Sequence, residues 1–170
     1  SEHPLDEGHT VNEIRIADRT IGAGHPTFVI AELSANHNHD LSRALASIDA
    51  AAEAGVDAVK FQTYTADTIT IDSDSEPFQV KGGTLWDGRT LYDLYSEAFP
   101  PWEWHEQLFE HAAQRGLIAL STPFDPTAIE LLESLDAPVY KVASMEIVDT
   151  PLIEQIASKG KPVIISTGIA

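Results

Sequence analysis

Short apolar runs alternate with helix-forming stretches from residue 28 onward. The runs predict buried strands at residues 28–33, 57–62, 117–122, 138–143 and 162–167. The stretch 40–54 places apolar residues at helical spacing and ends at Gly55, which predicts a helix with Asp40 at its N-cap. Further helices are predicted to open at Pro100-Pro101, at Asp125-Pro126 and at Thr150-Pro151.

The segments outside this alternation differ in character. Residues 1–10 are polar and read as a frayed tail, and residues 12–16 and 20–23 predict a hairpin around Ala17-Asp18-Arg19. We therefore separate residues 1–27, a tail with a hairpin, from the main fold at 28–170. The long connection 63–100 is typical of a functional loop or lid.

Strands that alternate with helices indicate parallel βαβ units, which either wind an open sheet or close into a barrel. No G-x-G-x-x-G follows the first strand, which weakens the case for a dinucleotide-binding fold. We predict an α/β fold of the (β/α)₈ TIM-barrel type. A complete barrel needs about 250 residues, so we expect these 170 residues to hold its first five strands and four helices.

Charge and composition exclude several classes of function. Ten Lys and Arg residues against twenty-seven Asp and Glu give a net charge of −17. Such a surface argues against nucleic acid and anionic membranes as partners and is compatible with high salt. The absence of cysteine excludes disulfides and thiolate chemistry. Without a leader-like or membrane-spanning apolar stretch, a cytoplasmic location is the expectation.

Polar residues gather where the predicted strands end, and in a barrel these ends face one rim that carries the active site. They are Glu32, Lys60, Gln62, Ser121, Thr122, Lys141, Ser144, Glu146, Ser166 and Thr167. Lys60 and Lys141 are two of only five lysines, and a lysine inside an apolar strand is costly without an anion. They suit the phosphate and carboxylate of one small ligand, although a structural ion pair is the simpler alternative. Glu32 and Glu146 are candidates for proton transfer, for orienting water or for binding sugar hydroxyls, or are counter-ions of the lysines.

The histidines and aromatic residues have simpler interpretations. His37 and His39 follow the first strand but show no metal-ligand spacing, so we expect them to make loop hydrogen bonds. His105 and His111 are expected on the surface of a helix. Six aromatic residues in and around the long connection predict a satellite core, or a wall against a sugar or partner subunit: Trp86, Tyr92, Tyr95, Phe99, Trp102 and Trp104.

Five motifs taken together resemble the N-acetylneuraminate (sialic acid) synthase family. They are FVIAELSANHNHDLSRA, AVKFQTY, LIALSTPFD, YKVASMEI and GKPVIISTG, in the family's order between residues 28 and 170. The segment 85–105, with LYDLY and PWEWH, is more similar to the pseudaminic acid synthase branch.

The resemblance implies a (β/α)₈ barrel followed by an antifreeze-like domain, in a domain-swapped homodimer. Such enzymes condense phosphoenolpyruvate with an N-acetylated amino-sugar aldehyde and release phosphate. By resemblance, the phosphoenolpyruvate-binding residues would be Lys60, Thr122, Lys141, Ser144 and Ser166. Glu32, Gln62 and Glu146 would face the reacting carbons and the sugar, with Glu146 handling the water.

The resemblance also implies a divalent metal, Mn²⁺ or Mg²⁺, whose ligands come from later barrel strands. We therefore expect no metal ligand in this chain, and little activity from the chain alone. His39 stands where many members carry glycine. Two alternatives stay open: a Schiff-base aldolase that uses Lys141 or Lys60, and a non-catalytic fragment that binds anions or self-associates through an unpaired sheet edge.

Overall fold

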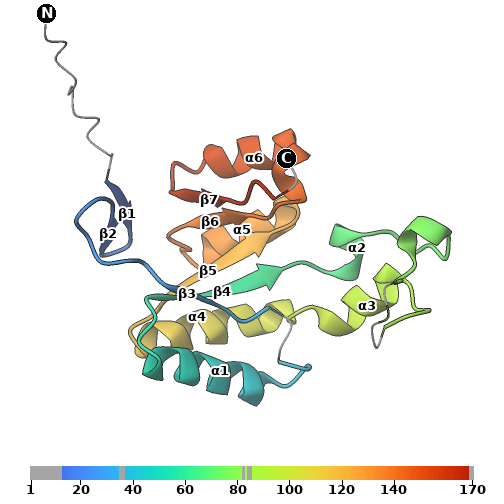
Figure 1. Cartoon of the computed structure of the whole chain (residues 1–170), viewed down its shortest axis with the longest axis horizontal. Helices are drawn as coiled ribbons and strands as arrows, with labels where there is room; N and C mark the ends of the chain where they lie inside the picture. Colours follow the sequence, from blue (N-terminus) through green and yellow to red (C-terminus); the bar gives the residue numbers. More distant parts are fainter. Residues whose placement is uncertain (1–12, 35–36, 82, 84–85, 169–170) are drawn as a thin grey trace, which may run out of the picture.

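The computed structural model describes residues 13–34, 37–81, 83 and 86–168 (Figure 1). The predicted tail, residues 1–10, lies outside these ranges. None of the helices in the described ranges has the length and apolar character needed to cross a membrane.

Five parallel strands form the central sheet, in the order in which they occur along the chain. They are β3 (Ile30–Glu32), β4 (Ala58–Thr63), β5 (Ile118–Pro123), β6 (Tyr140–Val142) and β7 (Val163–Ile165). Each lies within a predicted strand or within one residue of it. The order contains no reversal, so right-handed crossovers place all connecting helices on one face of the sheet. This is half of a (β/α)₈ barrel, as predicted.

Alternate strand residues face the helices and the barrel interior. On the helix side, Val59 and Phe61 pack with Ile48 and Leu108 from two helices, and Tyr140 and Val142 pack in a second apolar cluster. On the interior side, Ala58, Leu120 and Val139 form a third cluster together with Ile16 of the hairpin.

The hairpin of β1 (Ile14–Ile16) and β2 (Arg19–Ile21) confirms the prediction for this segment. Ile16 is buried in the interior cluster, so the hairpin covers the amino-terminal end of the inner face. Arg19 pairs with Asp57 at 3.1 Å, and Asp57 also accepts a hydrogen bond from the Val29 amide. One carboxylate thus joins the hairpin to the entry of the first two sheet strands.

The main helices are α1 (Leu41–Glu53), α4 (His105–Gln114), α5 (Pro126–Ser134) and α6 (Thr150–Ala157). Asp40 and Asp125 are the predicted N-caps and accept amide hydrogen bonds from the first turns of α1 and α5. Two boundaries differ from the prediction. Asp149 caps α6, because its side chain accepts from the amide of Leu152. The Pro100-Pro101 pair precedes a short 3₁₀ turn, Trp102–Trp104, before α4 begins.

The long connection between β4 and α4 carries secondary structure of its own. It holds α2 (Ala66–Ile69), a 3₁₀ turn (Glu76–Phe78) and α3 (Leu91–Ala98), and it extends beyond the sheet on the right of Figure 1. Thr90 and Asp93 form a capping box that starts α3. Neither α2 nor α3 is predicted by the sequence pattern of this segment.

Candidate active site

The interior residues at the carboxyl ends of the strands are polar, in contrast to the apolar layer below them. Strand alternation from Ala58, Leu120 and Val139 directs Lys60, Gln62, Thr122 and Lys141 to the interior face. Glu32 lies opposite Lys60 in the β3–β4 pairing, and Gln62 lies opposite Thr122 in the β4–β5 pairing. The structure therefore brings the predicted residues of four strands to one rim.

Glu32 and Lys60 form a salt bridge at this rim. Only 15% of the Lys60 side chain is exposed, against 41% of the Glu32 side chain. Glu32 also accepts a hydrogen bond from the Ser34 amide at 3.1 Å, which fixes the carboxylate at the end of β3. Glu32 is therefore a counter-ion of Lys60, as one of the two interpretations predicted, and its carboxylate still faces solvent.

Lys141 is the second interior ammonium group. Its Nζ donates to the Ser166 hydroxyl at 2.7 Å and to the Val142 carbonyl. Burial lowers the pKa of Lys141, and the nearby charge of Lys60 lowers it further. A partly buried ammonium group next to a second cation forms a site that an anion would stabilise.

Ser144 follows β6 and lies against the turn after β7. Gly168 has φ +38, and a Cβ added there would lie 2.3 Å from the Ser144 Cβ. Only glycine therefore lets this turn approach Ser144 closely. No local sequence signal predicts this role of Gly168, because it depends on a contact between two strand ends.

Glu146 begins a 3₁₀ turn, Glu146–Val148, that follows β6. Burial raises the pKa of its carboxyl, and the neighbouring charge of Asp149 adds to the effect. Its Oε2 is buried without a hydrogen-bond partner among the described residues. A raised pKa makes the ionised carboxylate a stronger proton acceptor.

A hollow of about 440 Å³ opens beside the Glu32 end of the rim. Its lining combines an imidazole, an amide, a carboxylate and an indole with small and apolar groups: Ser34, Asn38, His39, Trp86, Leu94, Glu97 and Ala98. Ser34, Asn38 and His39 have φ near +50. These values lie in the left-handed region of the backbone, which glycine adopts most readily.

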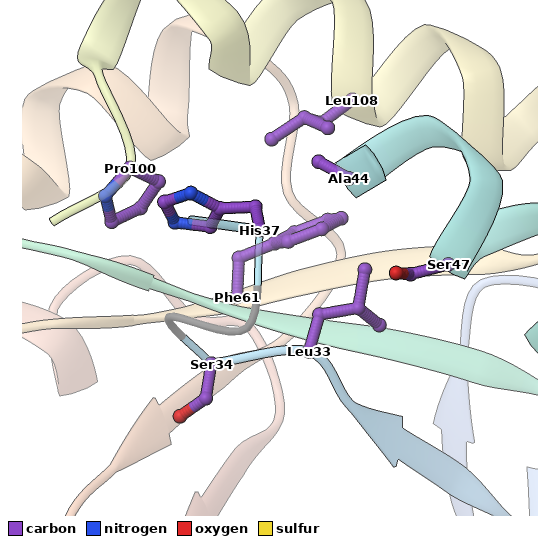
Figure 2. Close-up of a pocket in the computed structure, with 8 residues that line it drawn as sticks. All are labelled: Leu33, Ser34, His37, Ala44, Ser47, Phe61, Pro100 and Leu108. Carbon is purple, nitrogen blue, oxygen red and sulfur yellow. The ribbon is translucent and has the colours of Figure 1, made fainter. Parts of the chain in front are cut away.

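A much smaller cavity, about 10 Å³, lies on the helix side of the sheet (Figure 2). Leu33, Phe61, Leu108 and His37 are among its lining residues. The Nδ1 of His37 accepts from the His39 amide at 3.1 Å, which confirms a loop hydrogen bond. Burial lowers the pKa of His37. The cavity has room for about one water molecule and is separate from the rim.

The aromatic residues of the long connection divide into separate groups instead of one cluster. Trp104 and Phe99 pack edge-to-face on His37 and His39, respectively. Tyr95 packs on Tyr64, which also contacts Phe124. Trp86 lies under the guanidinium of Arg89 and lines the hollow. The ring contacts support a satellite core, and Trp86 forms part of the wall of the hollow.

His105 corrects a prediction, because it is fully buried instead of lying on the surface. Its Nε2 lies 2.9 Å from the Thr63 hydroxyl, which in turn lies 2.7 Å from the Ser121 hydroxyl. His111 is partly exposed and bonds Asp49 at 2.9 Å. The prediction of an exposed His105 was wrong because Thr63 of β4 provides a buried hydroxyl partner for the imidazole.

No group of three or more histidine, aspartate or glutamate side chains in the described ranges could hold a metal ion. The residues at the rim therefore do not fit a metal by themselves.

The sequence profile of the NeuB family matches residues 47–170, which form most of the chain. The chain belongs to the NeuB family. Among curated NeuB-like proteins, it is 52% identical to the pseudaminic acid synthase of Helicobacter pylori over 85% of this chain and 42% of that protein. It is 35% identical to the N,N'-diacetyllegionaminic acid synthase of Campylobacter jejuni over 85% of this chain and 43% of that protein. The chain thus spans about two fifths of the length of these relatives.

Solved structures agree with this membership. The N-acetylneuraminic acid synthetase of Leptospira borgpetersenii superposes with a TM-score of 0.81 at 30% identity, over 95% of this chain and 52% of that one. A DAHP synthase of Thermotoga maritima, 15% identical, superposes with a TM-score of 0.60 over 91% of this chain and 37% of that one, and shows the shared fold alone.

Proposed function

We propose that this chain carries the phosphoenolpyruvate half of a synthase that makes a nonulosonic acid of the pseudaminic or sialic type. The main observation in its support is that Lys60 and Lys141 both lie at one rim of the half-barrel. The names of the NeuB relatives, pseudaminic acid synthase and N,N'-diacetyllegionaminic acid synthase, support the same reaction class.

Phosphoenolpyruvate would place its phosphate and carboxylate on the two ammonium groups. Lys141 and Ser166 already form a donor pair at 2.7 Å, and the Thr122 and Ser144 hydroxyls lie on neighbouring strand ends. At the rim two lysines face two glutamates, whereas the whole chain has a net charge of −17. The positive and negative charges at the rim therefore balance, and an anion bound there is not exposed to the strongly negative charge of the surface.

The reaction needs a carbon nucleophile, an aldehyde and a water molecule. The C3 carbon of phosphoenolpyruvate bonds to the aldehyde carbon, whose oxygen takes up a proton, and water adds at C2. The C2–O bond to phosphate then breaks, which leaves the 2-keto acid and inorganic phosphate. Glu146, whose pKa is raised by burial, would accept the proton of the attacking water.

The amino-sugar aldehyde would enter from the side of the hollow. Ser34 lines the hollow and holds Glu32 through its amide, so a ligand there lies next to the Glu32–Lys60 pair. Carboxylate, amide and imidazole groups can bond sugar hydroxyl and acetamido groups, and an indole can pack on an apolar sugar face. Glu32 and Gln62 would then orient the aldehyde.

Calorimetric titration of the chain with phosphoenolpyruvate tests this proposal. Lys141→Ala should abolish detectable binding. Lys159→Ala is the matched control, since Lys159 follows α6 at the opposite end of the sheet, and it should bind as the wild type does. Binding that survives Lys141→Ala, or no binding by a folded wild-type chain, would contradict the proposal.

Three expectations stay predictions: the divalent metal and the homodimer, which the family resemblance implies, and the cytoplasmic location. The homodimer can be checked by analytical ultracentrifugation, in which a single monomeric species would contradict it for this chain.

A Schiff-base aldolase is a second candidate, because burial and Lys60 together lower the pKa of Lys141. Borohydride trapping with pyruvate separates the two functions by mass spectrometry. A stable adduct on Lys141 would favour the aldolase. The synthase proposal predicts no adduct, because its lysines act as charges and not as nucleophiles.

A further inference from the structure

A buried polar cluster lies on the helix side of the sheet, behind the rim. Thr63, Ser121 and His105 are all fully buried, and they come from β4, β5 and the start of α4. The Thr63 hydroxyl lies 2.7 Å from the Ser121 hydroxyl and 2.9 Å from the His105 Nε2. Apolar residues, among them Phe61 and Leu108, pack in the same interface between the sheet and the helices.

The protonation of His105 fixes the direction of each hydrogen bond. Burial lowers the pKa of His105 to about 4, so the imidazole is neutral at pH 7. Its Nδ1 faces the Pro101 carbonyl at 3.4 Å, an acceptor, and therefore carries the proton. Nε2 then accepts from Thr63, and Thr63 accepts from Ser121.

This chain of hydrogen bonds is coupled to the rim through the backbone. Gln62 and Thr122 each lie next to a member of the cluster in sequence and face the opposite side of the sheet. They are also register partners of each other in the β4–β5 pairing. A shift of Thr63 or Ser121 therefore moves a predicted site residue one peptide away.

The same cluster closes the base of the long connection. The Trp102 indole donates to the Tyr64 carbonyl at 3.1 Å, beside the contact between His105 and Thr63. The first and last residues of the connection are thus joined at the end of β4. The connection carries three lining residues of the hollow, Trp86, Leu94 and Glu97. The hydrogen bond between Trp102 and Tyr64 therefore helps to fix their positions.

We propose that His105 is a positioning residue of the synthase site, which holds the ends of β4 and β5 and the base of the long connection in the binding geometry. The inference rests on the proposed function. Apolar side chains of the same shape would fill this interface at similar or lower cost in stability. The hydrogen bonds add geometric specificity, because they can form in only one arrangement of β4, β5 and α4.

Phosphoenolpyruvate titrations of four variants of the chain test the inference. His105→Leu should weaken binding about tenfold or more, and Thr63→Val, which keeps the side-chain volume, should weaken it similarly. His105→Gln should restore most of the affinity, because its amide oxygen can accept from Thr63. His111→Leu removes a hydrogen bond of equal length, 2.9 Å, elsewhere on α4 and should leave affinity unchanged.

Folded His105→Leu and Thr63→Val variants that bind like the wild type would overturn the inference. If the wild-type chain itself binds no phosphoenolpyruvate, the proposed function fails, and the side-chain NMR signals of Gln62 and Thr122 decide the inference. Signals that move in His105→Leu but not in His111→Leu would support a positioning role. Signals that stay in place in both variants would overturn it.

Discussion

The two ends of the sheet's inner face carry opposite chemistry on the same strands. At the amino-terminal end, Ala58, Leu120 and Val139 are fully buried and covered by Ile16 of the hairpin. At the carboxyl end, each strand presents lysine, glutamate, glutamine or a hydroxyl residue to the interior. One end is closed by apolar packing, and the other stays polar and partly open.

The contrast separates stability from binding. The apolar end contributes the hydrophobic free energy that holds the strands together. The polar end places Lys141 where burial opposes its charge, which costs stability unless an anion binds. Substitutions at the two ends should therefore have different signatures.

Leu120→Ala should produce the largest effect, a loss of about 3 kcal/mol in the free energy of unfolding. Leu120 is fully buried in the interior layer, so the change leaves a cavity. Urea denaturation measures the loss. A cost below about 1 kcal/mol would mean that this end is not tightly packed.

Acid should weaken the fold through the carboxyl end. The folded pKa of His105 is about 4, below its ordinary value of 6.5. Between these values the unfolded chain binds more protons, so stability falls as pH drops from about 6.5 to 4, by up to about 3 kcal/mol. Urea denaturation at pH 7 and pH 4.5 measures the fall. It should be smaller in His105→Leu, and an equal fall in both proteins would contradict the assignment.

Alanine at the two glycines that flank β7 compares the ends directly. Gly168→Ala should weaken phosphoenolpyruvate binding about tenfold, or about 1.4 kcal/mol, because a Cβ there would collide with Ser144. Gly160 also has positive φ, but a Cβ at Gly160 would meet nothing within 4 Å. Gly160→Ala should strain the backbone and leave binding unchanged in calorimetry. Equal affinities for the two variants would count against the Ser144 contact.

Added salt should raise the stability of the fold and lower its affinity for phosphoenolpyruvate. Raising sodium chloride from 0.1 M to 1 M screens the repulsion among the acidic groups and should raise the stability by about 1 kcal/mol. The same salt should weaken phosphoenolpyruvate binding several-fold, because chloride screens Lys60 and Lys141. Thermal melts at both salt concentrations measure the change in stability, and titrations measure the change in affinity.

Much of the fold follows from sequence pattern. The five strands, the hairpin and the caps at Asp40 and Asp125 are local signals and are confirmed, although the edge strands β3 and β7 contain no buried residue. The helix α3 inside the long connection was not predicted, although Thr90 and Asp93 form a capping box, because its surroundings read as a loop. The cap at Asp149 was placed one residue late because Thr150 is an equally good cap by composition.

The site shows where sequence reasoning ends. Strand alternation predicted the rim, and the structure brings Glu32 to Lys60 and Lys141 to Ser166. It could not predict the contact of Gly168 with Ser144 or the burial of His105, because both depend on elements far apart in sequence. The roles assigned to the eight predicted residues stay predictions.

The five lysines of the chain allow one direct test of the central claim. In a sample with ¹³C- and ¹⁵N-labelled lysine, phosphoenolpyruvate should shift the side-chain NMR signals of Lys60 and Lys141. The signals of Lys81, Lys159 and Lys161 should stay in place. Shifts spread over these three lysines, or no shift at Lys60 and Lys141 in a folded sample, would contradict an anion site at the rim.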